Sequence, residues 1–513
     1  MKSRVVAIGL LFFSMPCWAV QYFVELGWVD SASPIYQQMI DPTLTEQVYR
    51  DHADQRLWFD LTSANHFEDR LAVIHRAGFS PLFDRQLALM QAYRQQQRWY
   101  EYDVLATDTL LQYLSYAEQA AKVGLSWFFD GQLTKPLVAP SEAALLALYN
   151  ALSTQTLSDL IDQTVPQNPA YQQLLHAYQS LLALESQPMA LYEQDNLTRP
   201  GDLLMERDVL LLRLSLVNLE PISLHDGTDF YDANLVALVK QFQNMHGLTP
   251  DGIIGPQTIK WLNTSVTERL AILALNAERI RLWSTQQESL ILVNIPAFAM
   301  QYWDEGEQVF AAKVVVGRVT RPTPVMNTKL DSLIINPIWN VPHKIMMEDI
   351  LPLVKRDHEY LAKHRIEIIR GWDDPEVMDP RLIDWANVNP ETFPYRLRQL
   401  AGSNNSLGAY KFNTPNSQAI YLHDTPNKNL FNRASRAFSS GCIRVENAQK
   451  FAQSLLTQQG IALTSLPSGT RTIALKKRIP VQIIYQTAWY EDGTLHYRDD
   501  IYGYDEASTV GHG

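Results

Sequence analysis

Cysteine is almost absent from this sequence, and its scarcity narrows the possible chemistry. Only Cys17 and Cys442 occur among 513 residues, too few for a disulfide framework. Glycine and proline are also sparse, at 22 and 27 residues, whereas 46% of the chain is hydrophobic. The chain can therefore bury extensive cores, and its length predicts roughly three domains.

Positive charge is in deficit as well. The chain has 43 basic against 55 acidic residues, which gives a formal net charge of -12. No basic tract interrupts this balance, so we expect no nucleic acid partner.

The first 19 residues have the pattern of a secretory signal. Lys2 and Arg4 precede an apolar run, Val5–Phe13, that is too short to span a membrane. Cys17-Trp18-Ala19 offers a cleavage site, so we expect export with no transmembrane anchor after cleavage. A lipoprotein signal with an acylated Cys17 is the alternative, but Met15-Pro16 fits its small-residue box poorly.

Cleavage would leave Cys442 as the one cysteine of the mature chain. The charge would become -14, from 41 basic and 55 acidic residues. An exported protein with one unpaired thiol is expected to have a reactive cysteine. His423 lies nineteen residues before Cys442. A thiol near pH 7 is only a few per cent thiolate, and a histidine can supply the base that activates it.

The flanking patterns predict how these two residues are presented. Gln418–His423 is short and mostly apolar and is followed by a turn signal, which predicts a strand ending at the histidine. Apolar residues after Cys442 recur at helical spacing and predict a helix from about Val445 or Glu446. The cysteine would then lie just before a helix N-terminus, which favours an anion. The amides of Gly441 and Cys442 would face a developing oxyanion.

A free cysteine is by itself more often a buried small hydrophobe. The surrounding motif favours catalysis instead, because Ser439, Gly441, Cys442, Ile443 and Arg444 match the pattern Ser/Thr-His-Gly-Cys-Ile/Val-Arg. This resembles the catalytic motif of the L,D-transpeptidases, the YkuD-like family. Ser440 stands where many members have a second histidine, a change that is familiar in their large periplasmic branch.

The resemblance implies a role for each residue. Cys442 would be the nucleophile and His423 the base, with the backbone carbonyl of Asp424 as third member and the amide of Gly441 in the oxyanion hole. Tyr421 would contact the acyl group or only pack, and Arg444 would hold a substrate carboxylate or bond the loop. The full set of expected substrate-binding residues is Tyr421, Arg444, Ser439, Ser440, Trp339 and Asn340.

A small helical module is expected before the catalytic region. Leu203–Leu219 and Asn234–Met245 have helical periodicity, and F-Q-N-M-H-G-L-T-P-D-G-I-I-G-P-Q-T follows from Phe242. Gly247 is expected as a helix cap, Asp251-Gly252 as a turn and Gly255-Pro256 as a helix start. The segment is similar to the peptidoglycan-binding module, which would hold the wall or only pack and guide substrate.

The β pattern of the catalytic region is interrupted once. Strands are expected at Leu290–Ile295, Ala297–Trp303, Val309–Val316, Ser332–Trp339 and, after the interruption, Gly408–Phe412. The intervening residues, about 343–404, look helical at Met346–Lys363 and would cap the substrate cleft as a lid. Three histidines there, His343, His358 and His364, fit no zinc signature, so we expect no metal and no cofactor.

These patterns predict a multidomain α and β protein. A helical scaffold resembles that of the large L,D-transpeptidases weakly, with helices expected at Leu110–Val123, Glu142–Leu152 and Tyr171–Leu184. The mainly-β catalytic domain carries a helical and loop cap insertion, and a hairpin around Asp492-Gly493 would add an edge to its sheet. The expected boundaries are 1–19 signal peptide, 20–195 scaffold, 196–265 peptidoglycan-binding module, 266–475 catalytic domain, and 476–513 hairpin and tail packing on the catalytic domain.

The resemblance also implies an activity in cell wall biogenesis in the periplasm of a Gram-negative bacterium. Cys442 would attack the third residue of a stem tetrapeptide, release D-alanine and transfer the acyl group to another diaminopimelate, giving a 3→3 cross-link. Partners would be peptidoglycan stem peptides, glycan and other cell-wall synthases, and carbapenems would acylate Cys442. The alternatives are an L,D-carboxypeptidase or a lipoprotein-anchoring enzyme with the same site, or a non-catalytic wall-binding scaffold, which the presence of both Cys442 and His423 disfavours.

Overall fold

The computed structural model describes residues 31–53, 55–218, 229–283, 288–462 and 469–505. The expected signal peptide, with Cys17, lies outside these residues. The chain forms two compact units, one of residues up to 72, 82–118 and 134–165, the other of 73–81, 119–133 and 166 onward. No helix in the described ranges is long and apolar enough to cross a membrane.

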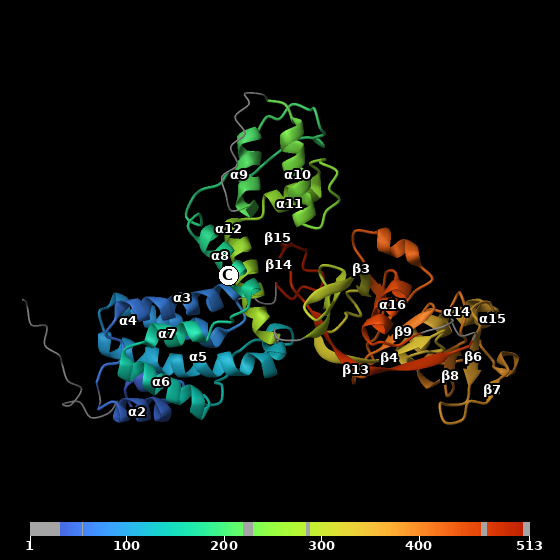
Figure 1. The fold of residues 1–513 in the computed structure, drawn as a ribbon, viewed down its shortest axis with the longest axis horizontal. Helices are drawn as coiled ribbons and strands as arrows, with labels where there is room; N and C mark the ends of the chain where they lie inside the picture. Colours follow the sequence, from blue (N-terminus) through green and yellow to red (C-terminus); the bar gives the residue numbers. More distant parts are fainter. Residues whose placement is uncertain (1–30, 54, 219–228, 284–287, 463–468, 506–513) are drawn as a thin grey trace, which may run out of the picture. The chain divides into compact units, whose positions relative to one another are not determined.

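The first unit is built from helices, as predicted (Figure 1). A buried carboxylate, Asp108, ties two of its segments together by accepting the amides of Ile40 and Asp41 at 2.7 and 2.8 Å. Burial raises the pKa of Asp108 to about 6. Helices of the N-terminal region are α1 Pro34–Gln38, α2 Pro42–Asp51, α3 Leu61–Ala77, α4 Pro81–Gln95, α5 Trp99–Phe128, α6 Glu142–Thr154 and α7 Leu157–Gln163.

The next helix, α8 (Pro169–Leu182), was expected in the scaffold segment but belongs to the second unit. It packs on α12 (Val266–Arg279), where the Tyr171 hydroxyl donates to Glu278 at 2.8 Å. The packing of α8 thus groups it with the second unit, whereas the break in sequence pattern near residue 195 grouped it with the scaffold, because such a break does not show which neighbour a helix packs against.

The small module forms the predicted three helices: α9 Arg207–Asn218, α10 Ala233–Met245 and α11 Pro256–Leu262. Gly247 and Gly252 take left-handed φ values of 68° and 78°, as expected of a helix cap and a turn. The Gln243 side chain joins α10 to this turn by accepting the Gly252 amide at 2.8 Å and donating to the Ile253 carbonyl at 2.9 Å.

The catalytic sheet has nine strands in the order β11-β3-β12-β10-β9-β4-β13-β1-β2, and a further β2–β3 pairing closes it on itself. One face encloses the core, and α16 (Ala448–Gln458) packs against it, with the rings of Phe451 and Phe412 4.4 Å apart. Strand bounds are β1 Ser289–Asn294, β2 Ala299–Asp304, β3 Glu307–Gly317, β4 Met326–Ile335, β9 Tyr410–Asn413, β10 Leu422–His423, β11 Ala437–Ser439, β12 Ile443–Val445 and β13 Arg471–Ile484.

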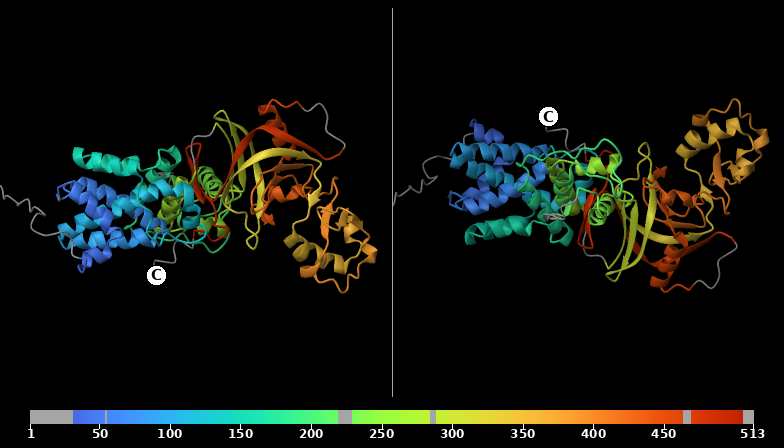
Figure 2. Two further views of the ribbon diagram at one scale, coloured as in Figure 1. Left: turned by 90° about the horizontal axis from the view of Figure 1, so that it is seen from below. Right: turned by 90° about the horizontal axis from the view of Figure 1, so that it is seen from above.

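The insertion was expected to consist of helices and loops alone, and the structure differs. It begins earlier than expected, at Trp339, and contains a four-stranded sheet of order β5-β8-β6-β7 with a core of its own (orange in Figure 2). These strands are too short to show a clear alternation in sequence. Its elements are β5 Trp339–Asn340, α13 His343–Ile345, a π-helical turn Met346–Ile350, α14 Leu351–Arg356, α15 Tyr360–Lys363, β6 Ile366–Ile369, β7 Val377–Met378 and β8 Arg396–Gln399.

The C-terminal hairpin is not an edge of the catalytic sheet, contrary to expectation. β14 (Ala488–Glu491) and β15 (Thr494–Tyr497) form a separate two-stranded sheet, whereas Val481–Ile484 belongs to β13 inside the main sheet. The hairpin contacts the small module through Tyr497, whose ring stacks on His246 at 5.3 Å. The expected boundary at 475 therefore divides β13.

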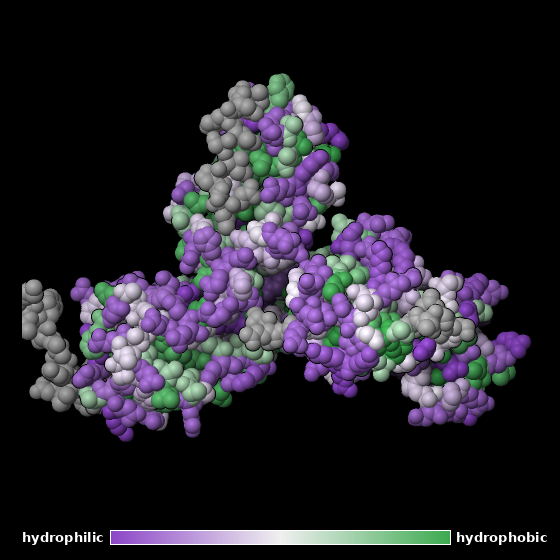
Figure 3. All heavy atoms as spheres, viewed as in Figure 1, coloured by the Kyte–Doolittle hydropathy of each residue, from purple (hydrophilic) through white to green (hydrophobic). Residues whose placement is uncertain are grey.

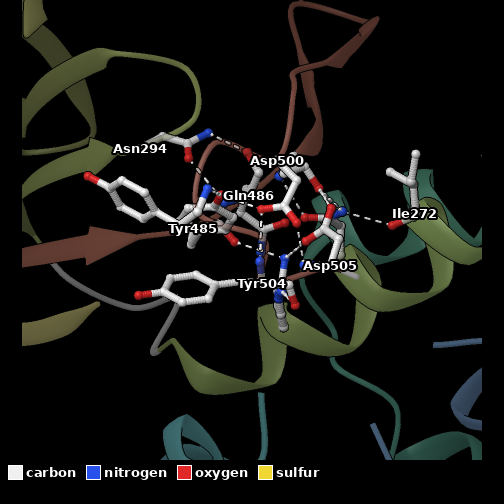
Figure 4. A network of polar contacts seen from close by, with 11 residues as sticks. Ile272, Asn294, Tyr485, Gln486, Asp500, Tyr504 and Asp505 are labelled. Carbon is white, nitrogen blue, oxygen red and sulfur yellow. Dashed lines mark hydrogen bonds and ion pairs between the residues drawn. The ribbon is translucent and has the colours of Figure 1, made fainter. Parts of the chain in front are cut away.

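A buried polar network anchors the tail to the second unit (Figure 4). The Arg279 guanidinium is fully covered and donates to Asp505 at 2.7 Å and to the Tyr504 carbonyl at 3.1 Å. Asp505 also accepts the Thr487 hydroxyl at 2.6 Å, and Tyr485 donates to Asp500 at 2.5 Å. Hydrophilic side chains predominate on the surface visible in Figure 3, with hydrophobic ones in small groups between them, which is usual for folded proteins.

Gly317, the last residue of β3, allows a close approach that any side chain would block. A Cβ there would lie 2.2 Å from the Arg321 carbonyl oxygen and 2.6 Å from the Thr323 amide. We expect Gly317→Ala to lower the stability of the catalytic domain by about 1–3 kcal/mol, since backbone must shift. Thermal unfolding measures this. Gly371→Ala is the control because nothing lies near its Cβ, and equal melting temperatures for the two variants would contradict the prediction.

Candidate active site

Three neighbouring strands bring the candidate catalytic residues onto one face of the sheet. His423 on β10 pairs with Lys411 on β9 and with Arg444 on β12. The residue next to each of them along its strand is buried in the core on the other face of the sheet: Leu422, Phe412 and Ile443. Because side chains alternate along a strand, Tyr421 and Cys442 lie on the same face as His423. The Tyr421 and His423 rings are 5.7 Å apart.

His423 is held in one tautomer by the backbone. Its Nδ1–H donates to the carbonyl oxygen of Asp424 at 2.5 Å, and the residue is only 6% exposed. A carbonyl oxygen can only accept, so Nδ1 carries the proton and Nε2 is the basic nitrogen. Burial, and then the charge of Arg444, lower the pKa of His423 to about 3. The imidazole is therefore neutral at physiological pH.

The Asp424 carbonyl is itself fixed by a ring of contacts. The Asp424 amide donates to Tyr410 at 2.8 Å, and its carboxylate accepts the Ala409 amide at 2.9 Å and the ammonium of Lys428. The chain passes close by at Gly408, where a Cβ would lie 2.4 Å from that carboxylate. The Asp424 carbonyl is therefore positioned for its expected backbone role, and the bonds of the Asp424 side chain help to hold it there.

Two hydroxyls shape the loop that carries Cys442. Ser439 accepts the Gly441 amide at 3.1 Å and donates to the Cys442 carbonyl at 2.6 Å. Thr323 is fully buried, accepts the Gly317 amide at 2.8 Å and donates to the Gly441 carbonyl at 2.7 Å. Gly441 takes a φ of 116°, which a side chain would strain. The loop is therefore built before any substrate binds.

These bonds bear on two expected roles. The Gly441 amide donates to Ser439, whereas the Cys442 amide has no hydrogen-bond acceptor among the described residues. Ser439 is only 2% exposed and its hydroxyl bonds within the loop, and its contact with substrate stays a prediction. Of the two expected oxyanion donors, the Cys442 amide is the one that this geometry leaves available.

The helix expected from about Val445 or Glu446 begins slightly later. β12 follows the cysteine, and α16 begins only at Ala448, after Asn447 in a left-handed conformation of φ 52°. The apolar spacing predicted the helix itself correctly. Before the helix, buried Ile443 and Val445 alternate with Arg444, which is the pattern of a strand. The dipole of α16 is therefore too remote to activate the thiol, because such effects fade within the first turn.

Cys442 is half-buried, and its thiol donates to the Ala419 carbonyl at 3.7 Å and hydrogen-bonds Tyr421. Burial raises the pKa of the Cys442 thiol, while Lys411 and Arg444 oppose this shift. Lys411 lies over the Tyr421 ring, with Nζ 4.1 Å from its centroid. Burial lowers the pKa of Lys411 in turn. The thiol is thus protonated at rest beside two cations that would stabilise its thiolate.

Lys411 was missed by the sequence interpretation. It lies in a predicted strand between the core residues Tyr410 and Phe412, and a polar residue at that alternation is ordinary. Lys411 could have been identified only from the pairing of its strand with the strand that carries His423. Register across strands is set by tertiary structure and is not visible in the local pattern.

The insertion is tied to the active-site loop by one arginine. Arg321 donates to the Ser440 hydroxyl at 3.0 Å and to Asp349 of the insertion at 2.6 Å, and also pairs with Glu348. Trp339, at the start of the insertion, hydrogen-bonds Tyr421. Ser440 therefore joins the catalytic loop to the insertion. Asn340 is exposed on β5 and is not brought into the cluster.

The comparisons with known proteins agree with this geometry. Residues 288–483 match YkuD, the L,D-transpeptidase catalytic domain. The chain contains an L,D-transpeptidase catalytic domain. Residues 43–177 match a scaffold domain, and residues 208–262 match the family described as "Putative peptidoglycan binding domain". The YkuD match extends through β13, which places that strand in the catalytic domain.

One curated relative matches about half of the sequence. A "Putative L,D-transpeptidase" of Haemophilus influenzae is 43% identical over 247 residues, which is 47% of this chain and 49% of the relative. The chain thus spans about half the length of the curated relative it matches.

Among solved structures, L,D-transpeptidases from Mycobacterium smegmatis and Stackebrandtia nassauensis are each 13% identical to this chain. The first match covers 38% of this chain and 58% of the relative, with a TM-score of 0.20. The second covers 60% and 100%, with a TM-score of 0.22. Scores this low carry no weight for function.

The pKa shifts predict the pH dependence of Cys442 reactivity. We expect alkylation by iodoacetamide to rise with pH and reach half its maximum above the usual thiol pKa, because burial raises the pKa of Cys442. No inflection is expected near a histidine pKa of about 6.5, since the pKa of His423 is lowered to about 3. Lys411→Met should move the profile to higher pH by removing a nearby positive charge.

Rates of adduct formation, read by intact-mass spectrometry of the protein without residues 1–19, provide the measurement. Lys477→Met is the control, because that lysine is exposed and pairs with Glu288. A profile with its midpoint in the acid range, as in a stable thiolate–imidazolium pair, would contradict a resting site of neutral thiol and neutral imidazole.

Proposed function

We propose that this protein is a cysteine-dependent L,D-transpeptidase that forms 3→3 cross-links between peptidoglycan stem peptides. The observation that carries this proposal is His423, whose Nδ1 is fixed by the Asp424 carbonyl on the sheet face that presents Cys442. A neutral imidazole with a free Nε2 is the base that a protonated thiol needs. The family of the catalytic domain supports the reaction class.

In the first half of the reaction, Cys442 turns from the Ala419 carbonyl and passes its proton to Nε2 of His423. The sulfur then attacks the carbonyl carbon of the third residue of a donor tetrapeptide, the L-centre of diaminopimelate. The Cys442 amide donates to the oxyanion, and Lys411 and Arg444 offset the charge on sulfur. When the C–N bond breaks, His423 returns the proton to the leaving D-alanine amine, and a thioester remains on Cys442.

In the second half, the side-chain amine of another diaminopimelate attacks the thioester. His423 removes a proton from this amine as the new C–N bond forms, and that proton returns to the sulfur as the C–S bond breaks. One peptide bond is made for the one that was lost, so no energy source is needed. Water in place of the amine would instead give the tripeptide, the product of an L,D-carboxypeptidase.

Arg444 is the strongest candidate for substrate recognition. Its Nε is buried, and within the described residues it has no hydrogen-bond partner. A buried donor left unpaired is costly, so a ligand carboxylate at this point would be favoured. The insertion, held by Arg321 and Trp339, would cover the peptide from the other side. The signal-like pattern of residues 1–19 supports export, so this activity would take place in the periplasm, where other cell-wall synthases would supply acceptor chains.

Reaction with disaccharide-tetrapeptide tests the activity. We expect the parent protein to make a dimer that lacks one D-alanine and is linked 3→3, while Cys442→Ala makes none. His423→Ala should lose roughly 10²–10⁴-fold in rate, as expected for removal of a general base. Mass spectrometry with fragmentation reads the linkage. Tripeptide alone would identify a carboxypeptidase, and unchanged substrate with wall binding retained would identify a scaffold.

Replacing Arg444 should weaken donor binding and, because its charge would also stabilise the thiolate, lower kcat. We expect Arg444→Gln to raise KM by roughly tenfold or more, because a hydrogen bond to a charged group contributes about 1.5–3 kcal/mol. Initial rates over a series of donor concentrations separate KM from kcat. Arg50→Gln on α2 is the matched control, since that side chain is exposed. An equal fall in kcat with unchanged KM would contradict a role in ground-state binding.

Carbapenems should acylate the same sulfur. The strained β-lactam carbonyl would take the place of the donor carbonyl, and ring opening leaves no small fragment to depart. We expect one adduct of the full drug mass on the parent and none on Cys442→Ala, read by intact-mass spectrometry. Absence of an adduct on protein that is active in the cross-linking assay would contradict this prediction.

A further inference from the structure

A cavity of about 780 Å³ lies on the face of the catalytic sheet opposite the core. Its floor comes from β1, β2 and β13, in which Leu292 pairs with Gln301 on one side and Gln482 on the other. The residues next to Leu292, Ile291 and Val293, are buried in the core, so the floor residues point outward. None of the active-site residues lines this cavity, and its volume is within the range of about 300–1,000 Å³ typical of ligand sites.

Aromatic side chains form much of the wall. Trp283, Trp303, Trp489 and Tyr490 line the cavity, and each is partly exposed. Trp303 is fixed by donating its indole N–H to Gln301 at 3.2 Å. Trp489 stacks on His496, with ring centroids 5.2 Å apart. Trp303 and Trp489 are thus held in place before any ligand binds, which lowers the entropic cost of binding.

The polar part of the lining consists mainly of amides. Gln482 and Gln486 are each 4% exposed, and Asn294 is 9% exposed. Asn294 donates to the Gln486 carbonyl at 3.1 Å and accepts its amide at 3.0 Å (Figure 4). A side-chain amide both donates and accepts, so such a lining suits a ligand that bears hydroxyl and amide groups.

Charge narrows the choice of ligand. Glu491 and Asp492 are the charged residues of the lining, which includes no lysine or arginine, and the structure describes every residue of it. An anionic ligand would be repelled there. Stem peptides carry free carboxylates, so the cavity is a poor site for them, whereas the sugar chain that bears them is neutral once its lactyl groups are amidated.

We propose that this cavity binds a segment of a neutral N-acetylated amino-sugar chain. The indole and phenol rings would stack on the apolar faces of the sugar rings, and the amides would pair with hydroxyl and acetamido groups. The choice of polymer rests on the proposed function, but the binding itself needs no turnover. A chain held on the outer face of the sheet would raise the effective concentration of its stem peptides near Cys442.

Titration of the Cys442→Ala protein with the tetramer of N-acetylglucosamine tests the site. The Cys442→Ala protein cannot turn over a substrate. Calorimetry and tryptophan fluorescence measure the binding. We expect saturable binding that Trp303→Ala weakens by about fivefold, as one aromatic contact is lost. Ala299→Trp on β2 should abolish binding by filling the cavity. Trp372→Ala is the matched control, because Trp372 is 47% exposed and lies outside the cavity. Circular dichroism confirms that each variant folds.

Three results would overturn the proposal. The parent could fail to bind the tetramer at millimolar concentration, or both cavity variants could bind as well as the parent, which would place sugar binding in the small module or elsewhere. Finally, a stem tetrapeptide could compete with the tetramer in the parent but not in Trp303→Ala, which would mean that the cavity binds the peptide. By contrast, if the parent protein bound the tetramer but could not cross-link stem peptides, only the transpeptidase proposal would be contradicted.

Discussion

The hydrogen bond from Nδ1 of His423 to the Asp424 carbonyl decides what the site can do. It leaves Nε2 as the basic nitrogen, and burial keeps that nitrogen unprotonated at physiological pH. The thiol beside it is protonated, so the resting site is a neutral acid and a neutral base. Charge develops only when the thiolate forms, at the point where Lys411 and Arg444 can stabilise it. The structure thus favours activation during reaction over a permanent ion pair.

The same bond depends on positions far apart in the sequence. The Asp424 carbonyl is fixed because Gly408 lets the chain approach its carboxylate, and the Cys442 loop is fixed by Thr323. Thr323 in turn donates its amide to the Tyr502 hydroxyl at 3.1 Å, so the C-terminal tail supports the catalytic loop. Arg321 links that loop to the insertion. Loop, tail and insertion therefore form one supporting shell around Cys442.

Much of this arrangement could be predicted from local patterns. The strand ending at His423 was predicted from an apolar run followed by a turn signal, and the glycine positions of the small module were predicted from its motif. The predictions failed where the outcome depends on pairing between distant segments. The short strand β12 before the helix was not foreseen, nor was the four-stranded sheet of the insertion. Lys411 was overlooked because only its register with His423 makes it notable. The bond from the Gly441 amide to Ser439 was not foreseen, because it depends on the fold of the loop.

The central claim is that Cys442 carries the substrate as a thioester while His423 moves the protons. Trapping that intermediate tests it most directly. Donor tetrapeptide mixed with the mature protein and quenched in acid within the first turnover should give an adduct equal to the donor less D-alanine. Digestion should place the adduct on the peptide that contains Cys442, and hydroxylamine should remove it. Cross-linked product that accumulates with no adduct on Cys442, or with an adduct on another residue, would contradict the claim.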